Sequence, residues 1–294
     1  MKTRILGKDL KVSAVGLGCM GMTHASGAPA DVKEMTELVG QALKHYRDKI
    51  VLATKCGVQH KGDHLEMDSR PETIRKSVEG SLKKLQTDHI DLYYQHRIDP
   101  KVEPEEVAGA MSELIKEGKI LHWGISEVDE EYLRRAHKVC PVTAIQNRLS
   151  MMYRDYEKLF PVLEELQVGF VAFSPLANGF LTACYRDTSQ FEQSPADFRS
   201  RMPQFTKEGV EQNADLLELI QTKAKEKDAT PAQISLAWML AKRPYIVPIP
   251  GSRKLSRLQE NLGAAEIELT KEEVAQIDDA LDHMTMSQVF GGHR

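Results

Sequence analysis

Several short apolar runs in this chain end directly in side chains that can do chemistry. Ile90–Tyr94 is one such run, and it is followed by Gln95, His96, Arg97 and Asp99. A buried strand that ends in an imidazole and charged groups places reactive side chains at one rim of a sheet. Chemistry in barrels of parallel strands sits at that rim, the carboxyl end of the strands. The strand-end groups are Gly18-Cys19-Met20, Lys55, His96, Ser126-Glu127, Gln146-Asn147, Ser174-Pro175-Leu176 and Gly251-Ser252-Arg253.

We expect these groups to converge at one open end of the barrel, the end where the strands have their carboxyl termini. This end is called the mouth. For each residue taken alone, an ordinary polar loop start is an equally good interpretation, because charged residues commonly begin loops.

The last group has a sharper chemical meaning. The segment GSRKLSRLQEN follows a strand and opens a helix, where main-chain N–H groups attract phosphate. Ser252 offers a hydroxyl, and Arg253 and Arg257 offer forked donors. A solvated basic first turn fits the same spacing.

Other sites are disfavoured. GLGCMG shares only glycines with the strand-GxGxxG-helix fingerprint, so a Rossmann dinucleotide site is not expected. His60 and His64 are four residues apart, but Gly62 lies between them and no third ligand is near, so we expect a solvated loop and no metal.

Strands and helices alternate along the whole chain. This rhythm predicts a parallel sheet with helices outside, closed into a barrel, as one domain over residues 1–294. A hairpin with a Gly7-Lys8-Asp9 turn is expected over residues 1–12, and residues 175–206 form a long irregular stretch of the kind that covers a binding site. The expected strands are 12–18, 50–54, 90–95, KILHWGIS, VTAIQN, VGFVAFS and YIVPIPGS. The expected helices are 32–47, one opened by Pro71, 104–117, 129–138, 154–166, 207–227, 230–243, 253–262 and one opened by Thr270 and Glu273.

Composition excludes several classes of protein. The 294 residues are 41% hydrophobic with a net charge of −4, and no basic stripe points to nucleic acid or to an anionic membrane. No apolar stretch approaches a membrane span, and the start lacks a signal-peptide core. The four cysteines, Cys19, Cys56, Cys140 and Cys184, form no CxxC pair, which indicates a reduced, cytoplasmic protein. The sequence does not indicate the oligomeric state.

Taken together, the strand-end motifs resemble those of the aldo-keto reductases. The likeness runs from Arg4 to Arg294 and is carried by VSAVGLGCMGM, IVLATK, DLYYQHRID, GKILHWGISE, AIQNRLSMM, GFVAFSPLANGFL, TPAQISLAWML and IPGSRKLSRLQENLGA. The resemblance implies a (β/α)8 TIM barrel. It also implies reversible hydride transfer from NADPH to a small aldehyde or ketone, in a site that uses Asp, Tyr, Lys and His.

The resemblance also assigns roles to residues. Lys55 and His96 match the catalytic Lys and His. Gln146 matches the amide that holds the nicotinamide carboxamide, Ser126 lies at a second such contact, and Phe173 matches the ring that stacks on the nicotinamide. The other implied cofactor contacts are Gly18, Met20, Ser174, Leu176, Gly179, Gly251, Ser252, Arg253, Arg257, Glu260 and Asn261.

The likeness is broken once. In the family, the catalytic Asp and Tyr come from the second strand and the loop after it, whereas here Glu34-Met35 runs almost directly into Glu37-Leu38-Val39-Gly40. One βα unit of about 30 residues is missing, and seven parallel strands can be counted where the barrel needs eight. Tyr46, the nearest tyrosine upstream of Lys55, is expected to pack inward on its helix and not to replace the lost donor.

Three interpretations remain open. The chain is an NADPH-dependent carbonyl reductase, or a catalytically impaired NADPH-binding protein on the same scaffold, or a chain that folds poorly. A fourth possibility is that the protein is an intact enzyme and that the sequence as written omits this unit.

Overall fold

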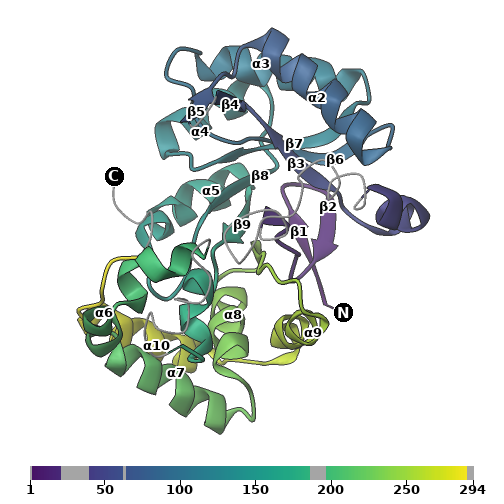
Figure 1. The fold of residues 1–294 in the computed structure, drawn as a ribbon. Coiled ribbons are helices and arrows are strands. Elements are labelled where there is room, and N and C mark those ends of the chain that lie inside the picture. Colours follow the sequence, from purple (N-terminus) through teal and green to yellow (C-terminus); the bar gives the residue numbers. More distant parts are fainter. Residues whose placement is uncertain (1, 21–39, 62–63, 186–196, 290–294) are drawn as a thin grey trace.

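The centre of the molecule is a curved sheet of six parallel strands, seen in a computed structural model that describes residues 2–20, 40–61, 64–185 and 197–289 (Figure 1). The spatial order of the strands is β10-β9-β8-β7-β6-β3. Neighbours in this order from β6 to β10 are also consecutive in the chain, as expected for repeated strand-helix units. The strands are β3 (Ala53–Cys56), β6 (Ile90–Gln95), β7 (Ile120–Ser126), β8 (Ala144–Arg148), β9 (Gly169–Phe173) and β10 (Ile246–Pro248).

Side chains alternate between the two faces of this sheet. Lys55 pairs with Tyr94, Tyr94 with Gly124, and Gly124 with Ala144, so these residues share the inner face. The inner face is covered by a small apolar cluster made of Leu6, Leu10, Leu92, Tyr94, Ala144, Val171 and Val247. Leu6 and Leu10 come from the N-terminal hairpin of β1 (Thr3–Leu6) and β2 (Leu10–Ser13), which plugs the barrel interior and confirms the predicted hairpin.

Helices cover the outer face of the sheet (Figure 1). Their apolar sides join the outward strand residues in the main core, where Tyr93, Trp123 and Phe170 are fully buried. Both helices predicted to start with a threonine cap do so, because Thr230 and Thr270 form complete capping boxes. The helices are α2 (Pro71–Leu85), α3 (Pro104–Lys116), α4 (Glu130–Val139), α5 (Phe160–Leu166), α6 (Lys207–Gln212), α7 (Ala214–Glu226), α8 (Pro231–Lys242), α9 (Leu255–Gly263) and α10 (Lys271–His283).

The sheet continues past β10 in a segment that is not a regular strand. Gly16 N–H donates to Pro248 O (3.0 Å) and Gly18 N–H donates to Pro250 O (3.2 Å). The predicted strand over 12–18 is therefore wrong in its bounds: β2 ends at Ser13, and residues 16–18 make only two bonds to the sheet. Counting this segment, the described residues fill seven sheet positions, and they place no strand beside β3 on the side away from β6.

The region before and after β3 differs from the prediction. The strand spans Ala53–Cys56, not 50–54, so Lys55 lies within it. The expected loop after it contains a second hairpin, β4 (Val58–Lys61) and β5 (His64–Met67), which holds both His60 and His64 in its strands. In the described part of the chain, no cluster of three His, Cys, Asp or Glu side chains suits a metal ion.

The first predicted helix is only partly seen. Residues 32–39 lie outside the described residues; residues 40–43 are helical and Lys44–Lys49 form a 3-10 turn, η2. Tyr46 on η2 is 57% exposed, so the expectation that it packs inward is wrong. The predicted helix over 207–227 is split at Asn213 into α6 and α7.

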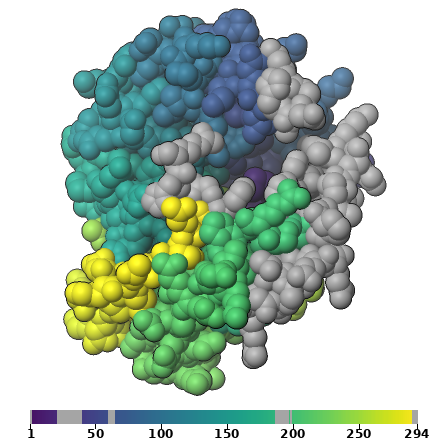
Figure 2. All heavy atoms as spheres, turned by 60° about the vertical axis from the view of Figure 1, so that its left-hand side comes forward, coloured from purple at the N-terminus to yellow at the C-terminus, as the bar shows by residue number. Residues whose placement is uncertain are grey.

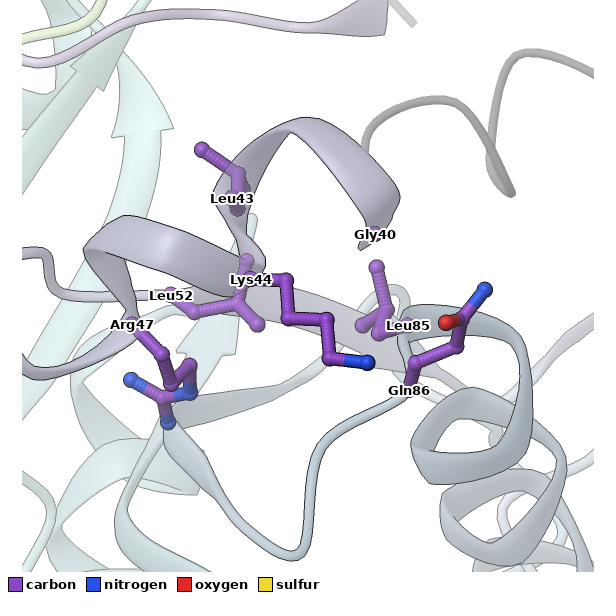
Figure 3. A pocket seen from close by; sticks show the side chains of 7 residues that line it. All are labelled: Gly40, Leu43, Lys44, Arg47, Leu52, Leu85 and Gln86. Atoms are coloured by element: carbon purple, nitrogen blue, oxygen red, sulfur yellow. The ribbon is translucent and has the colours of Figure 1, made fainter.

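A small hollow of about 40 Å³ lies next to η2 (Figure 3). It is lined by Gly40, Leu43, Lys44, Arg47, Leu52, Leu85 and Gln86. Because Leu52 precedes β3, the hollow lies at the amino end of that strand, away from the strand ends that carry the polar groups. None of the described helices has the length and apolarity that crossing a bilayer requires.

Candidate functional site

Lys55 and His96 lie side by side at the carboxyl ends of β3 and β6. Lys55 pairs with Tyr94 in the sheet, and His96 is two residues beyond Tyr94 on the same face. The backbone N–H of His96 donates to Cys56 O over 2.9 Å. This bond fixes the turn that carries the His96 side chain to β3. The structure thus brings together the two side chains that the sequence proposed as catalytic.

Lys55 is a partly buried cation. Burial lowers the pKa of its ammonium, and the nearby Arg97 charge lowers it further, whereas the thiol of Cys19 acts in the opposite direction. Within the described residues no carboxylate forms an ion pair with Lys55. Leaving a buried ammonium without an anion is costly.

The imidazole of His96 is neutral at physiological pH. Burial, Lys55 and Arg97, in that order of importance, lower its pKa to about 4. A neutral imidazole can donate one hydrogen bond to a substrate carbonyl, but it carries no extra proton to give away.

A chain of polar contacts runs from His96 across the next two strands. Arg97 Nη1 donates to His96 O (2.7 Å) and to Ser126 Oγ (3.3 Å). The Ser126 hydroxyl in turn donates to the backbone oxygen of Gln146 (2.8 Å). Ser126 and Gln146 are buried strand-end residues, and their contacts place them in the same mouth as Lys55 and His96.

Phe173 closes this side of the mouth at the end of β9. The Arg148 guanidinium lies 5.5 Å from the centre of its ring and 5.2 Å from that of Tyr153. Phe173 is therefore held by a cation–π contact at the position where the resemblance implies stacking on a nicotinamide.

Other polar strand-end residues have structural roles. Asn147 bonds both backbone groups of Val128 through its amide. Asp99 is buried and accepts from the N–H groups of Ser69 and Lys101. These residues do not face the mouth. The strand-end pattern therefore assigned more residues to the mouth than lie there, and for these residues the alternative of an ordinary loop start is the better interpretation.

A second group of predicted residues surrounds the start of α9. Ser252 and Arg253 precede the helix, which begins at Leu255, and Arg257 lies in its first turn. Arg257 Nη1 donates to Glu260 Oε2 over 2.8 Å, and Asn261 is buried. No side chain caps the helix start, so its N–H groups can receive an anion.

Gly18 and Gly251 approach each other closely beside this helix start. A Cβ on Gly18 would lie 2.6 Å from Ile249 O, and one on Gly251 would lie 2.8 Å from Gly18 O. The contact between two backbone segments explains both glycines. It also fixes the position of the loop that carries Ser252.

The loop after β9 lies next to the same group. Ser174 and Gly179 have left-handed backbones with φ of 51° and 98°, and Leu176 packs against the core. Arg257 Nη2 contacts the thiol of Cys184 at 3.6 Å, which joins the far end of this loop to α9. The predicted Met20 is 70% exposed and is the last described residue before position 40.

No tyrosine hydroxyl is found among the described interactions of Lys55. All eight lie among the described residues, and the interactions found for Lys55 involve Arg97 and Cys19, not a tyrosine hydroxyl. The hydroxyls of Tyr132 and Tyr245, for example, donate to Gln95 and Glu164.

Sequence reasoning named Arg97 at the rim but gave it no role, and it missed Arg148. Arg97 follows His96 directly and Arg148 follows Asn147, so both stood in the same strand-end pattern and could have been included. The contact between Cys184 and Arg257 joins residues far apart in the chain, and no local signal indicated it.

In Figure 2 the yellow atoms of the C-terminal segment lie against green atoms, and hydrogen bonds join Ser287 of this segment to Asn213. Asn213 is buried and bonds Ser287 twice, donating to its hydroxyl (2.7 Å) and accepting from its N–H (3.0 Å). A third bond runs from Asn213 Nδ2 to Gly209 O (2.7 Å).

Comparison with known proteins gives a consistent result. Residues 32–282 match the profile of the aldo/keto reductase family. The chain is 35% identical over 317 residues to a probable aldo-keto reductase of Glycine max, covering 97% of this chain and 89% of that protein. It is 37% identical over 312 residues to an aldo-keto reductase of Strobilurus tenacellus, covering 94% and 91%.

Solved structures agree. The glycerol dehydrogenase of Gluconobacter oxydans superposes with a TM-score of 0.85 at 27% identity, covering 99% of this chain and 98% of that one. An aldo-keto reductase of Bacillus halodurans in its holo form gives 0.76 at 26% identity, covering 100% and 99%. The two sequence alignments are longer than the 294 residues of this chain, so both relatives contain residues that have no counterpart here.

Proposed function

The chain belongs to the aldo-keto reductase family, and we propose that it binds NADPH across this mouth and reduces aldehydes or ketones slowly, because it lacks an internal proton donor. The observation that carries the proposal is the environment of Lys55. This cation lies beside His96 with no carboxylate and no tyrosine hydroxyl among its described contacts.

The residues of the second group suit the cofactor chemically. Arg253, Arg257 and Ser252 supply charged and hydroxyl donors at an uncapped helix start, which fits a phosphate monoester such as the 2′-phosphate of NADPH. Gln146, Ser126 and Phe173 offer an amide, a hydroxyl and a ring face at the other end of the mouth, which fits a nicotinamide. When bound, NADPH supplies the hydride.

The part that the protein's own side chains play in the reaction follows from the positions of Lys55 and His96. The neutral imidazole of His96 orients the substrate carbonyl through a hydrogen bond, and the Lys55 ammonium stabilises negative charge that develops on its oxygen. The oxygen must then take its proton from water. A positioned acid contributes roughly 10²–10⁴ in rate, and we expect a loss of that size here.

We further propose that the chain lacks one strand-helix unit of the family barrel. Three observations support this: the described residues leave the sheet position beside β3 unfilled, Glu34-Met35 runs almost directly into Glu37-Leu38, and both relatives have extra residues. The missing unit is the one that supplies the family's Asp and Tyr, so its loss accounts for the lack of an anion among the described contacts of Lys55.

A cofactor titration and a rescue experiment test the function together. We expect NADPH to bind and a simple aromatic aldehyde to be reduced slowly, with the rate rising in proportion to added imidazolium or phenol, which can donate the missing proton. Failure to bind NADPH contradicts the proposal. So does rapid reduction that added acids leave unchanged.

A further inference from the structure

Among the described residues, the mouth beside His96 carries more positive than negative charge. Three cations, Lys55, Arg97 and Arg148, act on one another or on His96. The carboxylate that the described residues place against the two arginines is that of Glu127, whose Oε2 lies 3.8 Å from Arg97 Nε. An excess of positive charge therefore remains where a substrate must lie, and such a site attracts anions.

Glu127 acts on both arginines from a turn whose backbone conformation is uncommon. Its backbone is left-handed, with φ of 54°, a conformation that residues with a Cβ adopt infrequently. Its N–H donates to Gln146 O (3.2 Å), so the turn is fixed on β8. One carboxylate thus acts on both Arg97 and Arg148.

Arg97 is built to receive a second anion. Its Nη1 is fixed by His96 O and Ser126 Oγ, whereas its Nη2 has no partner among the described residues. The side chain is 31% exposed, so it is anchored at one nitrogen and open at another. An anchored, partly desolvated guanidinium binds a carboxylate more strongly than a freely moving one, because less entropy is lost on binding.

Resting on the function proposed above, we propose that the substrate is a carbonyl compound that also carries a carboxylate, and that Arg97 binds this carboxylate while His96 orients the carbonyl. The phosphates of the cofactor do not compete for Arg97, since their proposed donors, Arg253 and Arg257, lie at α9. Arg97 then determines specificity for the substrate and is not part of the cofactor site.

Two substrates that differ by one charge test this. 4-Formylbenzoate and its methyl ester share the ring and the aldehyde. We expect kcat/KM to favour the acid by about tenfold or more, which is typical of a charged partner at a prepared arginine. Arg97→Gln should remove most of this preference by acting on the acid alone, and Arg97→Lys should keep part of it. Arg75→Gln, on the outer face of α2, is the matched control and should keep the full preference.

A binding measurement makes the test independent of turnover. The alcohol products, 4-(hydroxymethyl)benzoate and its methyl ester, contain no aldehyde that could react with Lys55. Calorimetry with and without saturating NADPH should show tighter binding of the acid to the parent protein and equal binding of both to Arg97→Gln. If NADPH fails to bind, the proposed function fails, yet the product preference still reports on Arg97.

Two results would overturn the inference. One is equal binding and reduction of acid and ester by the parent protein. The other is an Arg97→Gln variant that weakens NADPH binding but leaves the ratio of acid to ester unchanged, which would assign Arg97 to the cofactor.

Discussion

Replacing Lys55 with methionine should stabilise the protein. The resemblance implies that this lysine has a carboxylate partner in the family, and removing the lysine would leave that carboxylate buried alone. Here the described contacts of Lys55 include no anion, and Arg97 adds repulsion. Methionine has a similar length and needs neither a counter-ion nor water.

The size of the effect follows from partial burial. An isolated charge deep in a protein costs several kcal/mol. Lys55 is not fully buried, so we expect the Lys55→Met variant to gain about 1–2 kcal/mol at neutral pH. For a chain of this size that raises Tm by about 2–3 °C.

The gain must depend on pH in a defined direction. Because the pKa of Lys55 is lowered in the folded state, folding is penalised whenever the unfolded lysine is protonated. The penalty is full below the folded pKa and fades as the pH rises to the ordinary value of 10.5. The advantage of methionine should therefore be largest at neutral pH and small in strong alkali.

Urea unfolding followed by fluorescence at several pH values measures the change in the free energy of unfolding, with Lys76→Met as the matched control. Lys76 is exposed on α2, so its replacement should change the free energy of unfolding little. A Lys55→Met variant that loses about 3 kcal/mol or more would refute the reasoning, since that loss indicates a buried carboxylate left without its lysine.

Three further predictions concern other parts of the chain. Arg257→Gln should weaken NADPH binding about tenfold while leaving NADH binding unchanged, as measured by fluorescence titration, because it removes one charged contact to a 2′-phosphate; equal loss for both cofactors would contradict this role. Asn213→Ala should lower the free energy of unfolding by about 1–3 kcal/mol through loss of the bonds to Ser287 and Gly209, with Ser287→Ala losing less; a neutral Asn213→Ala would show that these bonds contribute nothing. The pKa of His96, about 4, should rise in Lys55→Met because a neighbouring cation is removed, and an NMR titration that finds it unchanged would show that Lys55 does not act on the imidazole.

Much of the architecture followed from local patterns. The capping boxes at Thr230 and Thr270 and the first hairpin follow from short-range sequence rules. The convergence of Lys55 with His96 follows from the parallel pairing of the strands that carry them. The parallel order of β6 to β10 follows from the alternation of strands and helices.

The errors have physical causes. The hairpin of β4 and β5 is polar and lies outside the main sheet, so it lacks the apolar alternation that marks a strand. Tyr46 has helical spacing, but no described strand lies beside β3 on the side away from β6, and its side chain is exposed. Asn213 ends α6 because its side chain bonds the backbone of Gly209 and residue 287, a long-range contact that periodicity does not reveal.

The most direct measurement is a single-turnover experiment with saturating NADPH and 4-formylbenzoate, run beside the Strobilurus tenacellus reductase. We predict that both proteins bind NADPH, that this chain oxidises it about 10²–10⁴ times more slowly, and that imidazolium accelerates this chain alone. Equal rates for the two proteins, unaffected by imidazolium, would show that a proton donor is present after all.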